Sequence, residues 1–174
     1  MEPTIIDNWL DLTFCECLSE NILYGISHDY GHLSNVKGKG EGNKFYYSAL
    51  DINSCHVRYM CQRIVMDAEK EKSRAFHLIK EVDIIRVYAN IQFRGMDGGF
   101  HVDDGDITVL YMVTPTLEDS GFFEYKENGK INRINFVRNR LILFSGNEHR
   151  GLSPNTDSPR VTVAFKMNKI NESN

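Results

Sequence analysis

The chain has no excess of basic residues and no long hydrophobic run. Its 174 residues include 20 Lys and Arg against 24 Asp and Glu, a net charge of −4, so we do not expect a broad basic face for duplex nucleic acid. No apolar segment approaches the roughly 20 residues that a membrane-spanning helix needs. The opening segment MEPTIIDNWLDL is acidic and lacks the basic start of a secretory signal. These absences predict a cytoplasmic protein with no membrane attachment.

Cysteine is also scarce, with four residues: Cys15, Cys17, Cys55 and Cys61. Cys15 and Cys17 lie two positions apart in a helical pattern, and residues at that spacing do not face each other. No pair has the spacing of a zinc site, even with His56 beside Cys55. We therefore expect reduced, partly buried thiols.

The remaining composition is that of an ordinary globular protein, with 41% hydrophobic and 25% charged residues. A chain of this length suits one domain, 1–174, with a single core. Within it, residues 1–75 are expected to form helical support and a loop, and residues 76–168 a β-rich core.

The first part of the chain predicts a strand, a helix and a long loop. Residues 5–10, IIDNWL, read as a short strand. Thr13 and Glu16 then form a capping box, which predicts a helix over about 14–24. Residues 25–48 are rich in Gly, Lys, Asn and Ser, which is typical of an irregular loop. Loops of this length in compact domains often act as lids or binding loops, or simply connect elements in solvent.

A second helix is expected after Asn53 or Ser54, either of which can cap it. Apolar residues recur there at the spacing of one buried stripe. The stripe consists of Val57, Met60, Cys61, Ile64, Val65 and Ala68.

From residue 76 the pattern changes to short apolar segments separated by turn signals. The segments ITVLYMV, GFFEY, INRINFV, RLILFS and RVTVAFKM are typical of strands. Asn128-Gly129 joins two of them and is a strong hairpin signal. The fold class is therefore mainly β with N-terminal helices (α+β), and the predicted architecture is an eight-stranded jelly roll whose interior can hold a site.

The segment GFHVDDGDITVLYMV, residues 99–113, carries the chemistry. His101 and Asp103 are two apart on a strand and point the same way, so both can bind one ion, whereas Asp104 points to the other face. His149 follows a later strand and can meet this pair, because strands distant in sequence pair in a jelly roll. Two histidines and one carboxylate leave three metal positions open, as in non-haem Fe(II) oxygenases.

A second motif begins the strand RVTVAFKM. The Arg160 guanidinium can bind a carboxylate through two parallel hydrogen bonds, as Lys cannot. Thr162 points to the same face and adds a hydroxyl donor. Together they predict a receptor for the far carboxylate of a dicarboxylic acid.

Residues 86–167, with these motifs in this order, resemble the Fe(II)/2-oxoglutarate-dependent dioxygenases, and most closely the prolyl 4-hydroxylase-like branch. The early segment IIDNWL is similar to the start of that branch. The resemblance implies a double-stranded β-helix, the cupin-like form of the jelly roll. It also implies Fe(II), 2-oxoglutarate and O2, with ascorbate as a candidate reductant.

The resemblance also assigns roles to residues. The iron ligands would be His101, Asp103 and His149. Arg160 and Thr162 would bind the C5 carboxylate of 2-oxoglutarate. Many prolyl hydroxylases hold this cosubstrate with a Tyr at the position of Gln92, whose amide can also donate. Asn90 lies on the same strand face and is a further cosubstrate candidate.

The candidate substrate residues are Tyr88, Glu124 and Lys166. Tyr88 shares the strand face of Asn90, and Glu124 stands where the family usually has Thr or Leu. Lys166 shares the strand face of Arg160, although we expect its side chain to reach solvent at the strand end.

The resemblance implies hydroxylation of a C–H bond, with 2-oxoglutarate converted to succinate and CO2. A prolyl or other residue of a peptide or protein is the leading substrate. The alternatives are a free amino acid or other small molecule, or a non-enzymatic cupin-like metal-binding module. Nucleic-acid demethylation is disfavoured by the acidic charge. The sequence predicts neither the substrate's identity nor the oligomeric state.

Overall fold

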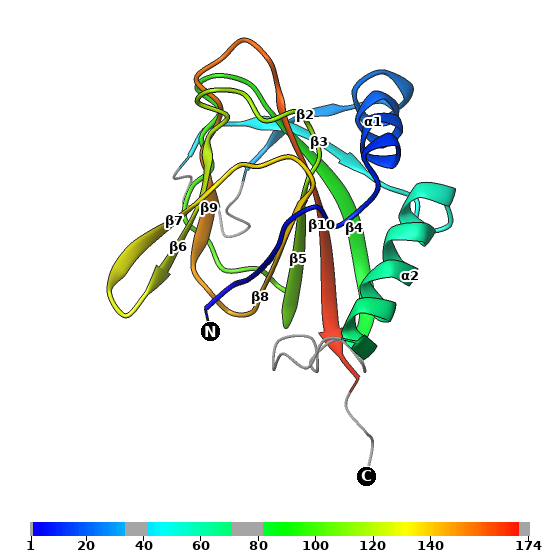
Figure 1. Ribbon diagram of the computed structural model, residues 1–174. Helices are drawn as coiled ribbons and strands as arrows, with labels where there is room; N and C mark the ends of the chain where they lie inside the picture. Colours follow the sequence, from blue (N-terminus) through cyan, green and yellow to red (C-terminus); the bar gives the residue numbers. More distant parts are fainter. Residues whose placement is uncertain (1, 34–41, 71–81, 171–174) are drawn as a thin grey trace.

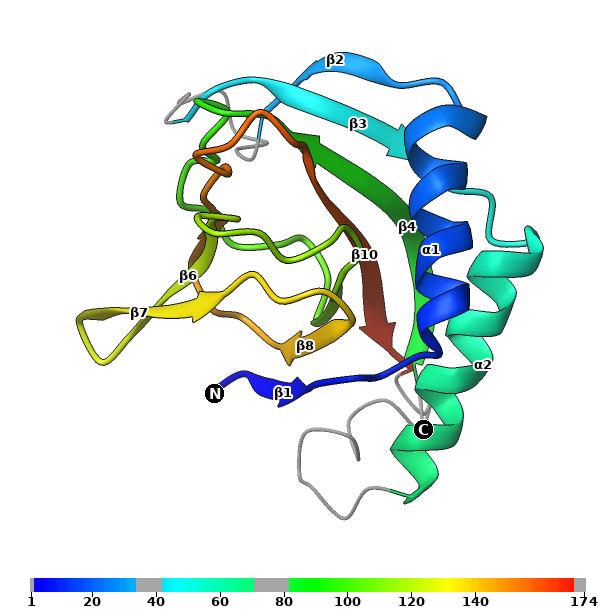
Figure 2. The ribbon, with the colours of Figure 1, turned by 45° about the horizontal axis from the view of Figure 1, so that its top comes forward.

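The structure, a computed structural model, describes residues 2–33, 42–70 and 82–170. A large sheet and a small sheet face each other, and two helices lie along the outer side of the large sheet (Figures 1 and 2). The large sheet has the order β1-β8-β5-β10-β4-β3-β2 and the small sheet the order β7-β6-β9. All paired strands are antiparallel.

The strands have the following bounds. Those of the large sheet are β1 (Thr4–Ile6), β8 (Arg140–Phe144), β5 (Ile107–Met112), β10 (Arg160–Lys169), β4 (Val82–Gln92), β3 (Phe45–Ala49) and β2 (Asp29–His32). Those of the small sheet are β7 (Lys130–Asn135), β6 (Phe122–Glu127) and β9 (His149–Gly151). This is the expected double-stranded β-helix. The described residues form seven strands in one sheet and three in the other, where eight were expected in all. Strands β1, β2 and β3 lie at the two edges of the large sheet.

Helix α1 (Leu12–Glu20) begins earlier than predicted. Its N-cap is Asp11, whose carboxylate accepts hydrogen bonds from the backbone N–H groups of Thr13 and Phe14 at 2.8 and 3.4 Å. The predicted capping box at Thr13 was therefore wrong: an Asp two residues upstream already satisfies the free N–H groups of the first turn. The helix continues into a π-helical turn, Asn21–Gly25.

Helix α2 (Cys55–Lys70) follows Ser54, whose hydroxyl accepts from the Val57 N–H at 3.4 Å. Its buried stripe contains Val57, Met60 and Ile64. Val65 was wrongly included in that stripe. It is 48% exposed, because it is one residue, about 100° of helix, beyond Ile64. The side chain of Ala68 lies outside the described residues.

The loop expected over residues 25–48 is partly regular structure. Strands β2 and β3 lie within or at its borders and form an edge of the large sheet. Residues 34–41 between them lie outside the described residues, as do the first residues of the expected β-rich region, 76–81. The predicted hairpin is present: Asn128 and Gly129 have φ values of 51° and 74°, as a two-residue turn between twisted strands requires.

Two apolar clusters fix the layers. One packs α1 and α2 against the outer side of the large sheet, and the other, around Phe123 and Phe144, lies between the two sheets. Side chains of β10 alternate between the two faces of the large sheet. Val161, Val163 and Phe165 belong to the cluster on the helix side. The intervening residues therefore face the space between the sheets, where a site can form.

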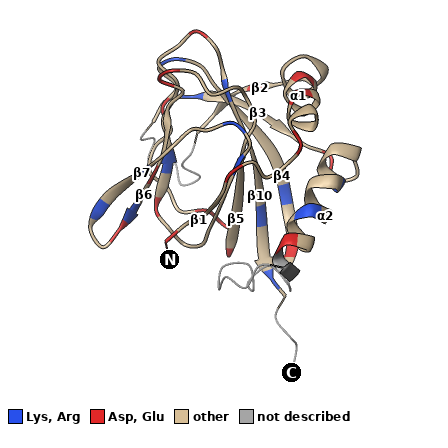
Figure 3. Ribbon diagram, in the orientation of Figure 1, with Lys and Arg blue, Asp and Glu red and all other residues tan. Residues whose placement is uncertain are grey.

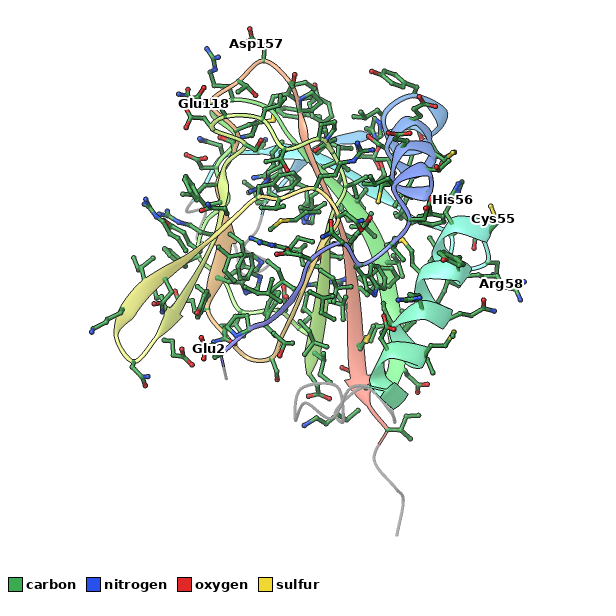
Figure 4. The ribbon with its side chains drawn as sticks, in the orientation of Figure 1. Glu2, Cys55, His56, Arg58, Glu118 and Asp157 are labelled. Atoms are coloured by element: carbon green, nitrogen blue, oxygen red, sulfur yellow. The ribbon has the colours of Figure 1, made fainter. Side chains whose placement is uncertain are left out.

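The surface features agree with the composition. Lys and Arg positions are interspersed with Asp and Glu positions along strands and helices (Figure 3). All four cysteines are free, with Cys15 buried and Cys17 exposed. At the start of α2, Cys55 is exposed and the ring of His56 packs against Phe14 of α1, with centroids 5.7 Å apart (Figure 4). Within the described ranges, the helices are too short or too polar to cross a bilayer.

Candidate metal centre and acid pocket

Backbone pairing brings the two candidate histidines together. His101, before β5, and His149, at the start of β9, form an isolated antiparallel bridge. The His101 N–H donates to the His149 carbonyl at 3.0 Å, and the His149 N–H donates back at 2.9 Å. Their ring centroids are 4.4 Å apart. Residues separated by much of the β-rich region are thus held side by side by two hydrogen bonds.

Asp103 completes the cluster. The candidate ligand atoms of His101, Asp103 and His149 all lie within 4.8 Å of one another. The Asp103 Oδ1 is 3.5 Å from His101 Nε2, and its Oδ2 is 3.5 Å from His149 Nε2. The Nδ1 atoms of the two rings lie 3.0 Å from the Gly99 carbonyl and 2.8 Å from the Asn147 carbonyl. A carbonyl only accepts, so Nδ1 carries the hydrogen and Nε2 keeps a free lone pair.

The charges of the cluster suit a divalent cation. Burial lowers the pKa of His149 to about 4, so this imidazole is neutral at pH 7. Burial alone would raise the pKa of Asp103. The neighbouring His101 ring and the charge of Lys166 outweigh burial, and the pKa of Asp103 lies well below its usual range. Two imidazoles and one carboxylate are the donor set of a 2-His-1-carboxylate site, so the residues present fit the metal that the sequence implied.

The neighbouring aspartates, Asp104 and Asp106, have other partners. Asp104 forms a 2.7 Å ion pair with Arg86. The Asp106 carboxylate accepts from the Lys169 backbone N–H at 2.9 Å. Neither belongs to the cluster of candidate ligand atoms.

Arg160 begins β10 and lies buried beside the cluster. It donates through Nη1 to the Phe122 carbonyl at 2.9 Å and through Nη2 to the Gln92 side-chain oxygen. Its Nε has no partner, and no carboxylate of the described residues lies in an ion pair with it. Burial lowers its pKa to about 10, so the guanidinium remains charged at pH 7. A buried cation without a counter-ion is costly, and an anionic ligand would relieve that cost.

Gln92 supports Arg160. Its oxygen accepts from Arg160, and its amide donates to the Met96 carbonyl at 2.6 Å. Asn90 lies two residues before Gln92 on β4, and its buried side-chain oxygen has no hydrogen-bond partner among the described residues. Thr162 faces Asn90 across the β4–β10 pair. Arg160 and Thr162 on β10, with Gln92 and Asn90 on the neighbouring strand β4, are called the acid pocket from here on.

A cavity of about 650 Å³ joins the metal cluster to the acid pocket. Aromatic side chains form much of its wall: Phe45, Tyr47, Tyr88, Phe100, Phe123 and Phe144. All but one of the site residues predicted from sequence line it, namely His101, Asp103, His149, Arg160, Thr162, Gln92, Asn90, Tyr88 and Lys166.

The exception is Glu124, which was proposed as a substrate residue. Its side chain is 1% exposed, and its two oxygens accept from Arg133 Nε at 2.6 Å and Arg150 Nε at 2.8 Å. It lies between Phe123 and Tyr125 on β6, which pack into the inter-sheet cluster, so alternation places it on the opposite face. The structure therefore assigns it to an ion-pair network outside the cavity.

Glu124→Gln is expected to lower the free energy of unfolding by about 1–3 kcal/mol at pH 7, because two arginines lose a buried partner. Burial alone would raise the pKa of Glu124, but hydrogen bonds from Arg150 and Arg133 lower it. The stabilisation is therefore present above the ordinary Glu pKa and is lost as pH falls through the folded-state pKa.

Urea unfolding at pH 7 and at acid pH measures this difference. Glu148→Gln is the matched control, because Glu148 pairs with Lys126 where both side chains are about two-fifths exposed, and such pairs contribute about 1 kcal/mol at most. Equal losses in the two variants would contradict the assignment.

Lys166 and Thr108 both contact Asp103, which the sequence did not predict. Lys166 was expected in solvent, but its side chain is 3% exposed and its ammonium contacts Asp103. The Thr108 hydroxyl donates to the Asp103 Oδ2 at 2.6 Å. The alternation of β10 already placed Lys166 on the cavity face of Arg160, and the error was to place the end of the strand too early.

Comparison with known proteins gives a consistent result for the fold. No family model and no curated protein matches the chain. Solved structures do. A Trichoplax adhaerens prolyl hydroxylase in complex with a hypoxia-inducible-factor peptide is 16% identical, with a TM-score of 0.73 over 96% of this chain and 83% of that chain. The fold is that of the 2-oxoglutarate- and Fe(II)-dependent oxygenases.

Other oxygenase structures agree. A Pseudomonas putida prolyl 4-hydroxylase is 11% identical with a TM-score of 0.69, covering 94% of this chain and 91% of that chain. The α-ketoglutarate-dependent epimerase SnoN of nogalamycin biosynthesis is also 11% identical, with a TM-score of 0.74 over 96% of this chain and 78% of that chain. At such identities the likeness establishes the oxygenase fold alone, and the neighbours differ in the reaction they catalyse.

Proposed function

We propose that the protein is an oxygenase that uses Fe(II), 2-oxoglutarate and O2 to hydroxylate a C–H bond in a prolyl or other residue of a peptide or protein. One observation carries the proposal. The metal-ligand cluster of His101, Asp103 and His149 and the buried Arg160, which lacks a carboxylate partner among the described residues, line one cavity. A metal-binding module without enzymatic activity has no need of a buried guanidinium fork beside its metal.

Each residue has a defined task in this proposal. His101, Asp103 and His149 would hold the iron, which when bound supplies the oxidation of the C–H bond coupled to conversion of 2-oxoglutarate to succinate and CO2. Arg160 and Thr162 would bind the far carboxylate, and Gln92 keeps Arg160 in place. The aromatic side chains of the cavity wall would limit the water around these charged contacts and so strengthen them.

The proposed peptide substrate rests on the fold comparison. The Trichoplax adhaerens prolyl hydroxylase binds a peptide fragment, and other neighbours include prolyl hydroxylases. The epimerase SnoN, which acts in nogalamycin biosynthesis, favours a small molecule as the second candidate.

Succinate release from 2-oxoglutarate, measured with Fe(II) against proline-containing peptides and free amino acids, tests the proposal. We expect substrate-stimulated succinate release, with a mass gain of one oxygen on a peptide. Stimulation by free amino acids alone would select the small-molecule reading. A protein that binds neither Fe(II) nor 2-oxoglutarate is not an oxygenase.

A further inference from the structure

The ammonium group of Lys166 is directed at a candidate metal ligand. Lys166 is the last of the cavity-facing residues of β10, and its Nζ contacts the Asp103 Oδ2. The same Nζ lies 3.1 Å from the Thr108 hydroxyl, which donates to that Oδ2 at 2.6 Å. One carboxylate oxygen thus receives two donors. Each oxygen also lies near one histidine: Oδ1 is 3.5 Å from His101 Nε2, and Oδ2 is 3.5 Å from His149 Nε2.

This unequal use of the two oxygens bears on how Asp103 can bind a metal. The donors from Lys166 and Thr108 occupy Oδ2, and Oδ1 is left for the cation. A carboxylate held in this way binds through one oxygen. Binding through both oxygens would take one more position on the metal, and 2-oxoglutarate and O2 need the open positions that a 2-His-1-carboxylate site leaves.

The charge of Lys166 has a second effect. A buried ammonium beside the ligand repels a divalent cation, and at such short range this interaction is strong. The same positive charge attracts a dianion such as 2-oxoglutarate. Lys166 therefore lowers the affinity for metal and raises the affinity for the cosubstrate. A residue that only filled space would not change the two affinities in opposite directions.

We propose that Lys166 is a positioning residue that makes Asp103 a one-oxygen ligand, lowers the affinity of the site for metal and raises its affinity for the dianionic cosubstrate. This inference rests on the proposed function. It assigns to Lys166 a role toward the metal site in place of the substrate contact considered from sequence.

Three variants separate charge from hydrogen bonding. Lys166→Met removes both the charge and the donor at similar length, Lys166→Gln removes the charge but keeps a donor, and Lys166→Arg keeps both. Calorimetry of the metal-free protein with Co(II) measures metal affinity, and titration of the Co(II)-loaded protein measures 2-oxoglutarate affinity. The visible absorption of bound Co(II) reports its coordination number. All three readouts are independent of turnover.

We expect Lys166→Met to bind Co(II) about tenfold more tightly and 2-oxoglutarate about tenfold more weakly. Its Co(II) absorption should weaken, as a higher coordination number requires. Lys166→Gln should show the same two affinity changes with a wild-type absorption spectrum, and it carries the affinity test if Lys166→Met does not fold. Lys166→Arg should stay within about threefold of wild type.

Two results have distinct meanings. Wild-type protein that takes up no Co(II) would overturn the proposed function itself. Wild-type protein that binds Co(II), combined with charge-removing variants whose Co(II) affinity is equal or lower, would overturn the role of Lys166 and leave the proposed function standing.

Discussion

His149→Ala is expected to abolish stable binding of divalent metal and, with it, all 2-oxoglutarate turnover. The variant loses one of three ligands, and Asp103 with His101 alone cannot hold a divalent ion as three convergent donors can. The ring is also packed, with its centroid 4.6 Å from that of Phe144 and 5.4 Å from that of Phe123. Its removal should cost about 1–3 kcal/mol of stability without unfolding the sheets.

Calorimetry with Fe(II) under anaerobic conditions measures the loss of metal binding, and circular dichroism shows whether the fold is kept. His56→Ala is the matched control, because His56 lies at the start of α2, where its ring packs against Phe14 of α1 and not against the metal cluster (Figure 4). It should bind metal as the wild-type protein does. Undiminished metal binding or turnover in a folded His149→Ala variant would remove His149 from the site.

Arg160→Ala is expected to raise the 2-oxoglutarate concentration needed for half-saturation by about 100-fold or more, with metal affinity near that of wild type. A charge-assisted fork to a carboxylate in a buried site is worth about 3 kcal/mol or more, and each 1.4 kcal/mol corresponds to a factor of ten. Arg160→Lys keeps the charge but not the two-pronged hydrogen bonding. The 2-oxoglutarate concentration that half-saturates it should therefore lie between those of the wild-type protein and Arg160→Ala. Titration of the metal-loaded protein measures all three.

Gly151→Ala tests the placement of Arg160 without altering its charge. A Cβ at Gly151 would collide with Arg160 Nη2 and would lie 3.1 Å from the Gln92 oxygen. We expect weaker 2-oxoglutarate binding with unchanged metal affinity. If Arg160→Ala and Gly151→Ala both bind 2-oxoglutarate as wild type does, the guanidinium is not its receptor.

The sequence alone determined much of the local structure, because the signals concerned are local. The Asn128-Gly129 turn predicts its hairpin through the φ values that only such residues adopt readily. The two-residue spacing of Arg160 and Thr162 predicts a common face through the alternation of a strand, and both lie on β10. The same argument predicted that His101 and Asp103 converge, and they do, although both precede β5 and lie outside a regular strand. Resemblance in the order of these motifs indicated the oxygenase fold, which the solved structures confirm.

Only the tertiary structure decided which faces and strands meet. The bridge that joins His101 to His149 is a pairing between distant segments, and alternation within one strand says nothing of its partner. The same limit explains Glu124, which is buried against two arginines outside the cavity, and Lys166, which is buried against Asp103. Alternation divides a strand into two faces, but which face is covered, and by what charge, depends on packing across the whole fold.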